Sequence, residues 1–95
     1  MRADALAKIS EWLSTTVAEL VRHPDSVHVR RVADTGTTAV FLITVSGPDT
    51  GRVIGARGQT ITAIRRLVST MSRHHHLQVL VDVAGTHAGP SRSGS

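Results

Sequence analysis

Residues 51–60 are Gly51-Arg52-Val53-Ile54-Gly55-Ala56-Arg57-Gly58-Gln59-Thr60, with three glycines placed around an apolar pair. This pattern predicts a short helix that begins near Gly51, a tight turn from Gly55 to Gly58, and a second helix that begins at Gln59. Glycine suits such a turn because it tolerates a positive φ and the close approach of another backbone. The same spacing of two glycines also occurs in ordinary turns between helices, so the interpretation depends on the sequence around it.

Downstream of this segment, the sequence predicts a long helix and then a strand. Between Gln59 and Arg73 apolar residues recur every three or four positions, as on one face of a helix. They are Ile61, Ile64, Leu67, Val68 and Met71, and the opposite face carries Arg65, Arg66 and Arg73. From Leu77 to Val83 the alternate residues Leu77, Val79, Val81 and Val83 are apolar, which is typical of a strand with one buried side.

Upstream, the sequence predicts one helix and two strands. Residues 5–22 carry an apolar stripe at helical spacing, and the proline in His23-Pro24-Asp25 ends that helix. Residues 27–32 alternate as a short, half-exposed strand, and residues 34–37 supply a turn. Residues 39–45 are continuously apolar, which predicts the central strand of a sheet, paired with the preceding strand as a hairpin.

The composition predicts one folded domain and excludes several kinds of chemistry. The chain has 95 residues, 40% of them hydrophobic, which suits a single core. It has no cysteine, so a disulfide framework, a zinc site with cysteine ligands and a thiol nucleophile are excluded. No apolar run is long enough for a membrane span, and the first residues do not resemble a signal peptide. We therefore expect a cytoplasmic protein with no membrane partner.

The basic residues favour a nucleic-acid partner. Eleven basic residues outnumber seven acidic ones, and all of them except Lys8 are arginines. Arginine presents a planar set of donors that suits phosphate and stacks on bases, although such charge also serves solubility alone. Backbone N–H groups at a helix start carry partial positive charge. We expect those of the glycine turn to face outward and to bind phosphate, assisted by Arg52 and Arg57, and a side chain at Gly55 or Gly58 to keep the phosphate away.

Together with Ile61, Ala63-Ile64-Arg65 and Leu67, residues 51–60 resemble the signature of the KH family. The similarity covers about residues 5–83 and is strongest to small bacterial single-KH proteins of the KhpA group. It implies an α+β fold, the type II (prokaryotic) KH domain of order α-β-β-α-α-β, with helices packed on one face of a three-stranded sheet. We assign residues 1–84 to this domain and residues 85–95 to a disordered tail, which is too poor in apolar groups to pack.

The resemblance also implies binding of single-stranded RNA with low sequence specificity, in the role of a post-transcriptional regulator or an RNA chaperone. In KH domains the glycine turn clamps the backbone of about four nucleotides, and bases enter a shallow apolar groove between that turn and the sheet. The residues expected at the RNA are Gly55, Ala56, Arg57 and Gly58 in the clamp, with Arg52, Val53, Ile54, Gln59, Thr60 and Arg65. Of these, Val53 and Ile54 lie on the groove wall or in the core beneath it. Many relatives carry a basic residue where Ala56 stands, so the contact depends more on backbone donors and Arg57.

Two alternatives remain open. A backbone clamp need not sense the 2′-hydroxyl, so single-stranded DNA is a second class of ligand. The domain is alternatively a protein-interaction module with little RNA binding of its own, and the resemblance implies a homodimer or pairing with a larger KH-containing protein. Trp12 lies beside the apolar stripe of the first helix, where it either covers the edge of the core or meets such a partner.

The remaining residues predict no enzyme, no cofactor and no metal site. The acidic residues are scattered, no pair is spaced for acid-base chemistry, and no nucleophile stands beside a histidine on a suitable scaffold. Residues His74-His75-His76 are adjacent and so point in different directions, which favours a solvated helix end over a metal site. Phe41 and Trp12 are too few aromatic residues for the stacking surface of an RRM or cold-shock domain. Without stacking, a single domain is expected to bind RNA weakly.

Overall fold

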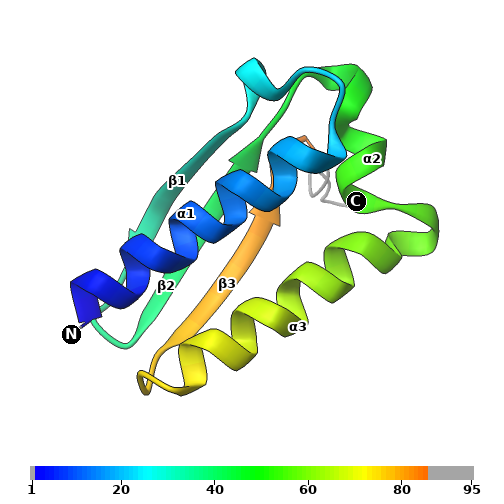
Figure 1. Ribbon diagram of the computed structural model, residues 1–95. Helices are drawn as coiled ribbons and strands as arrows, with labels where there is room; N and C mark the ends of the chain where they lie inside the picture. The colour runs from blue at the N-terminus through cyan, green and yellow to red at the C-terminus, as the bar shows by residue number, and fades with distance from the viewer. Residues whose placement is uncertain (1, 86–95) are drawn as a thin grey trace.

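The computed structural model describes residues 2–85, and the predicted order of elements is confirmed (Figure 1). The helices and strands are α1 (Arg2–Leu20), β1 (His28–Asp34), β2 (Thr38–Thr44), α2 (Thr50–Ile54), α3 (Gln59–Arg73) and β3 (Gln78–Val83). Short 3₁₀ turns lie at η1 (Pro24–Ser26), η2 (Gly47–Asp49) and η3 (Ala56–Gly58). Within residues 2–85, no helix is both long and apolar enough to cross a membrane.

The three strands form one mixed sheet with β2 in the centre. The hairpin prediction is confirmed, because β1 pairs antiparallel with β2. β3 pairs with β2 in parallel, so the chain must cross back over the sheet between these two strands. The register places Ala39 beside Val79, Phe41 beside Val81 and Ile43 beside Val83. These rows are buried and form the floor of the core.

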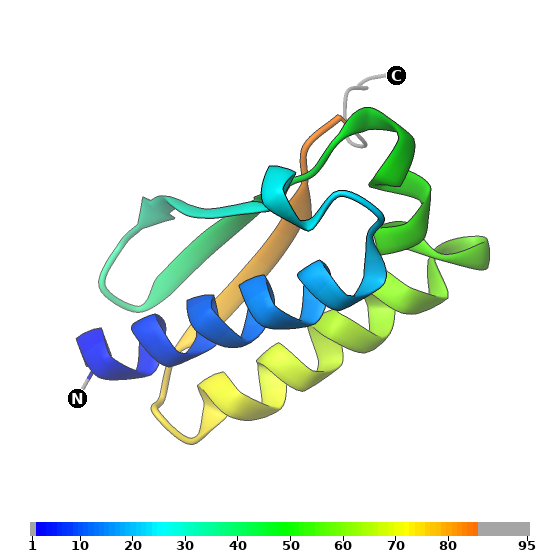
Figure 2. The same ribbon diagram turned by 45° about the horizontal axis from the view of Figure 1, so that its top comes forward.

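Two long helices, α1 and α3, lie side by side on one face of the sheet (Figures 1 and 2). The apolar stripe predicted for the first helix is buried, with Leu13 and Val17 fully enclosed. In α3 the buried residues are Ile61, Ile64, Val68 and Ser72. Burial of one such aliphatic side chain stabilises a fold by about 1.5–3 kcal/mol. The core therefore lies between the helix pair and the sheet, as predicted for helices packed on one face of the sheet.

One residue of α3 and the strand β1 differ from the sequence-based expectation. Leu67 is 52% exposed, because one residue corresponds to a rotation of about 100° in a helix and its neighbour Val68 occupies the centre of the buried stripe. β1 is longer than expected, and of its residues only Val29 is even half-buried. The pairing register shifts between Arg31 and Ala33. Such an irregularity is common in an edge strand.

The placement of Trp12 bears on one of the open alternatives. Its side chain is half-buried and packs against the core cluster, as expected if it covers the edge of the core. The predicted tail falls outside the described residues except for Gly85, which follows β3.

Candidate functional site

The glycine turn between α2 and α3 has the predicted tight backbone. Gly55 has φ 77° and ψ 170°, Arg57 has φ 56° and ψ 25°, and Gly58 has φ 75° and ψ 15°. Positive φ is uncommon for a residue with a side chain and is often found at functional sites. Ala56 and Arg57 form the exposed tip of the turn. This geometry presents the main chain of two residues to solvent.

The hydrogen bonds of the turn restrict which amides can bind a ligand. The N–H of Gly55 donates to the carbonyl of Gly51 at 2.8 Å, that of Gly58 to Gly55 at 3.1 Å, and that of Gln59 to Ala56. The N–H groups of Ala56 and Arg57 have no hydrogen-bond partner within residues 2–85. The expectation that the whole turn exposes its donors is therefore corrected to two adjacent amides.

These two amides belong to a backbone conformation suited to anions. Arg57 is left-handed, whereas Ala56 before it does not have a positive φ. Successive N–H groups in a tight turn of this kind form a concavity that binds anions. The Arg57 side chain is exposed at the same place and adds a full positive charge. A phosphate oxygen is the simplest group that fits both features.

The two glycines of the turn are needed for different reasons. A Cβ atom at Gly55 would overlap the Thr60 hydroxyl and lie 2.9 Å from the Thr60 backbone nitrogen. A Cβ atom at Gly58 would meet nothing within 4 Å. Gly55 is therefore required by packing as well as by its backbone angles, whereas Gly58 is required by its positive φ alone.

We predict that Gly55→Ala costs about 3 kcal/mol or more of unfolding free energy, because it adds a steric clash to a glycine-only conformation. Gly58→Ala, the matched control, should cost about 1–2 kcal/mol. Urea denaturation of both variants measures the difference. Equal losses would contradict the packing role of Gly55.

A buried carboxylate positions the segment that leads into the turn. Asp49 is 1% exposed and accepts hydrogen bonds from the N–H of Arg22 at 3.2 Å and the N–H of His23 at 3.0 Å. Its Oδ2 atom also accepts the Ser46 hydroxyl at 2.9 Å and lies 3.0 Å from His23 Nδ1. Asp49 directly precedes α2 and therefore ties the start of that helix to the chain leaving α1.

This role is not evident from the sequence, because Asp49 is one of several acidic residues with no local pattern. Burial raises the pKa of Asp49, but the hydrogen bonds from the Arg22 amide, the His23 side chain, the Ser46 hydroxyl and the His23 amide outweigh it. The net effect lowers the pKa of Asp49 from 3.8 to about 2. The carboxylate is therefore bound in its charged form.

We predict that Asp49→Asn unfolds at a lower temperature than the wild type at pH 7. The folded-state pKa lies below the unfolded value, so the charged carboxylate stabilises the fold above about pH 4. This contribution is lost as the pH falls toward 2. The difference in melting temperature should therefore shrink between about pH 5 and pH 2, measured by circular dichroism.

Asp25→Asn is the control, since Asp25 is exposed in the neighbouring 3₁₀ turn. Asp25→Asn should change the melting temperature little at pH 7 and at lower pH. A constant gap between Asp49→Asn and the wild type over the whole pH range would show that the charge of Asp49 does not stabilise the fold.

The other residues expected at the RNA are spread over the surface, the rim and the core. Arg52 is exposed, with Nε 3.7 Å from Asp49 Oδ1. Gln59 is exposed, and Ile54 and Thr60 are half-buried. Val53 is fully buried, so it belongs to the core beneath the turn and offers no surface to a ligand. The turn and its flanks thus retain Arg52, Arg57 and Gln59 as accessible side chains.

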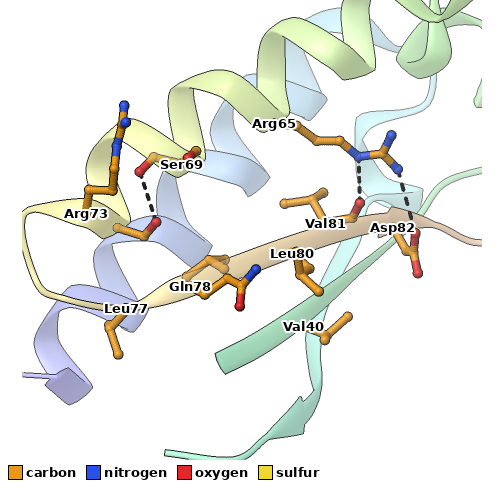
Figure 3. Close-up of a pocket in the computed structure, with 11 residues that line it drawn as sticks. Val40, Arg65, Ser69, Arg73, Leu77, Gln78, Leu80, Val81 and Asp82 are labelled. Carbon is orange, nitrogen blue, oxygen red and sulfur yellow. Dashed lines mark hydrogen bonds and ion pairs between the residues drawn. The ribbon is translucent and has the colours of Figure 1, made fainter. Parts of the chain in front are cut away.

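Arg65 is not beside the turn but bridges α3 to β3 (Figure 3). Its Nε donates to the carbonyl of Val81 at 2.9 Å, and its Nη2 lies 3.6 Å from Asp82 Oδ1. The sequence indicated only that Arg65 lies on the polar face of its helix. The parallel placement of β3 beside α3 supplies the acceptors that hold this side chain.

A groove of about 610 Å³ lies between α3 and the free edge of β3. Its floor is apolar, with Leu77, Val79, Leu80 and Val81 contributed by β3 and the residue before it. Arg65 and Asp82 stand at one end, and Arg73 and Gln78 line the other (Figure 3). A shallow apolar groove was expected from the family resemblance, but its lining residues on β3 were not identified from the sequence.

The charged side chains around the turn and the groove are almost all positive. Residues 50–81 contain five arginines and no aspartate or glutamate. The acidic residues that bracket this stretch are both engaged, Asp49 with the chain after α1 and Asp82 with Arg65. A polyanion approaching this side of the molecule therefore meets little competing negative charge.

The three histidines after α3 are exposed and form a turn. The N–H groups of His75 and His76 donate to the carbonyls of Ser72 and Arg73. No group of three histidine, aspartate or glutamate side chains within residues 2–85 is arranged to hold a metal ion.

The element order, the glycine turn between two helices and the groove beside β3 define a type II KH domain. Comparison with protein families agrees with this class, because the family model "KhpA/KhpB, KH domain" matches residues 10–83. The chain belongs to the KhpA/KhpB family of KH-domain proteins.

Similar curated proteins carry one name. The chain is 32% identical over 75 residues to the RNA-binding protein KhpA of Chlamydia caviae. The aligned residues cover 79% of this chain and 95% of that protein. It is also 32% identical over 75 residues to the RNA-binding protein KhpA of Listeria monocytogenes, covering 79% and 97%. The RNA-binding protein KhpA of Lactiplantibacillus plantarum is 36% identical over 63 residues. No solved structure matched the chain significantly.

Proposed function

We propose that this chain binds single-stranded RNA, with a backbone phosphate at the Ala56 and Arg57 amides and bases along the groove between α3 and β3. The observation that carries this proposal is the pair of exposed amides, which have no partner among the described residues 2–85 and belong to a turn of the kind that binds anions. The similar proteins named RNA-binding protein KhpA support it. We infer a cytoplasmic protein of low sequence specificity that acts as a post-transcriptional regulator or an RNA chaperone.

The groove supports the placement of the bases. Unstacked bases have apolar faces and polar edges, and RNA-binding domains use both. The apolar floor of the groove suits the faces, and the backbone of the β3 edge suits the polar edges. The turn directly precedes α3, so a strand held at Arg57 can continue along the helix into the groove. Single-stranded DNA is a weaker candidate ligand of the same clamp, since the amides contact phosphate and not the 2′-hydroxyl.

We predict that Gly58→Asp abolishes binding of a short single-stranded RNA, while Gly58→Asn retains it. Aspartate and asparagine tolerate the left-handed conformation of Gly58 about equally. Only aspartate places a negative charge beside the bound phosphate, and like charges in contact cost several kcal/mol. The aspartate variant should therefore bind at least about tenfold more weakly than the asparagine variant, measured by fluorescence anisotropy.

A change at Gly58 alone is a sharper test than a change at both glycines. Gly55 packs on Thr60, so a change there would disturb the fold as well as the site. Equal melting temperatures of the two Gly58 variants confirm that they differ in charge alone. Equal RNA affinities would remove the turn from the binding site.

We also predict binding in the micromolar range with a moderate dependence on salt. A clamp for three or four phosphates should give a slope of log K against log salt concentration of about −2 to −3 for a single strand. Arg57→Gln should reduce this slope by about 0.7, because one cationic contact is lost. A slope near zero would show that phosphate contacts do not drive the binding.

Protein pairing is a second candidate function, favoured by the outward-facing Leu67. This leucine is 52% exposed on α3, next to the exposed Ala63 one turn earlier. We propose that α3 meets a second copy of this chain or a larger KH-containing partner through this strip. Sedimentation equilibrium of the wild type and Leu67→Gln tests the homodimer. A wild type that is monomeric, with unchanged sedimentation in the variant, counts against it.

A further inference from the structure

The free edge of β3 has a defined set of hydrogen-bonding groups. The N–H of Gln78 donates to the carbonyl of Thr37 at 2.9 Å, and that of Ala84 donates to Ile43 at 2.8 Å, so the even-numbered residues face β2. Backbone groups alternate sides along a strand, so the odd-numbered residues Val79 and Val81 face the groove. The hydrogen bond from Arg65 to the Val81 carbonyl agrees with this alternation.

Arg65 changes what this edge offers to a base. An unmodified strand edge presents both a donor and an acceptor at Val81, its N–H and its carbonyl. In this chain the carbonyl already accepts a hydrogen bond from Arg65 Nε at 2.9 Å, which uses one of its two lone pairs. The guanidinium contributes further N–H donors at the same place, and arginine has no acceptor. The edge at Val81 therefore presents more donors than acceptors.

The arrangement is held from two sides. Asp82 Oδ1 lies 3.6 Å from Arg65 Nη2, with both side chains 49% exposed. An ion pair at this exposure contributes little by itself. The hydrogen bond to Val81 is part-buried and has a charged donor, which makes it the stronger of the two contacts. If Arg65 left, the Val81 carbonyl would lose its partner next to an apolar floor.

We propose that Arg65 determines the base preference of the groove, and this inference rests on the proposed RNA binding. A base that turns its 4- or 6-substituent toward Val81 meets this donor-rich edge, which matches the O4 carbonyl of uracil and the O6 carbonyl of guanine. The same edge opposes the N4 amino group of cytosine and the N6 amino group of adenine, which are themselves donors. The groove thus favours uracil and guanine over cytosine and adenine at the position next to Val81.

The test compares hexamers of uridine and of cytidine, because these pyrimidines have equal size and differ in the group that the edge contacts. The wild type should bind the uridine hexamer about threefold to tenfold more tightly, which corresponds to one hydrogen bond gained or opposed. Arg65→Met frees the Val81 carbonyl and should abolish or reverse this ratio. Hexamers of inosine and of adenosine, which differ at the corresponding O6 and N6 groups, should show the same pattern.

Arg66→Met is the matched control. Arg66 is the exposed neighbour of Arg65 on α3 and carries the same charge. Its replacement should weaken both hexamers by the same factor and leave their ratio unchanged. Loss of the ratio in Arg65→Met alone would support the proposal, since both variants lose one positive charge.

Three results would overturn the inference. They are a wild type that prefers cytidine or binds both hexamers equally, an Arg65→Met variant with the wild-type ratio, and an Arg66→Met variant that shifts the ratio as much. A preference for cytidine would show that Arg65 moves away and exposes the Val81 carbonyl when RNA binds. Each of these results leaves RNA binding intact, whereas failure of the wild type to bind any hexamer overturns the proposed function as well. The wild-type ratio needs no variant, so the absence of a uridine preference overturns the inference even if Arg65→Met does not fold.

Discussion

The parallel pairing of β3 with β2 is the constraint on which the rest of this structure depends. Parallel neighbours cannot be joined by a tight hairpin, so the chain must return over one face of the sheet before β3 begins. That return contains α2, the glycine turn and α3. The same pairing leaves one edge of β3 open beside α3, where the groove lies. The glycine turn and the groove are therefore two consequences of a single crossover connection.

The turn shows how a short motif divides its tasks. Gly55 allows the chain to pass against Thr60, and Gly58 allows the left-handed angle at which α3 begins. Neither glycine offers its own amide, because the N–H of Gly55 donates to Gly51 in α2 and that of Gly58 donates to Gly55. The amides left for a ligand belong to Ala56 and Arg57. The absence of a basic side chain at Ala56 consequently matters less than the backbone conformation that the glycines permit.

Charge contributes in two distinct ways around this site. Asp49 is buried and accepts amide and hydroxyl hydrogen bonds. It holds the start of α2 against the chain that follows α1, so its charge stabilises the fold. The arginines of residues 50–81 are exposed, and their charge favours the approach of a polyanion. Arg65 combines both roles, because it ties α3 to β3 while it alters the hydrogen-bonding groups at the edge of the groove.

The order of the elements, most of the buried stripe on each helix, the alternation in β3 and the location of the turn could all be predicted from local sequence. These features depend on local periodicity and on the backbone freedom of glycine, which are properties of neighbouring residues. Long-range packing, in contrast, makes Val53 part of the core, leaves Leu67 exposed, buries Asp49 as an acceptor and brings Arg65 to Val81. Each of these outcomes requires a partner from a distant part of the chain, such as Arg22 for Asp49 or β3 for Arg65. Helical or strand spacing carries no information about which distant element packs beside a residue, so the contacts at the groove could be found only once β3 was placed next to α3.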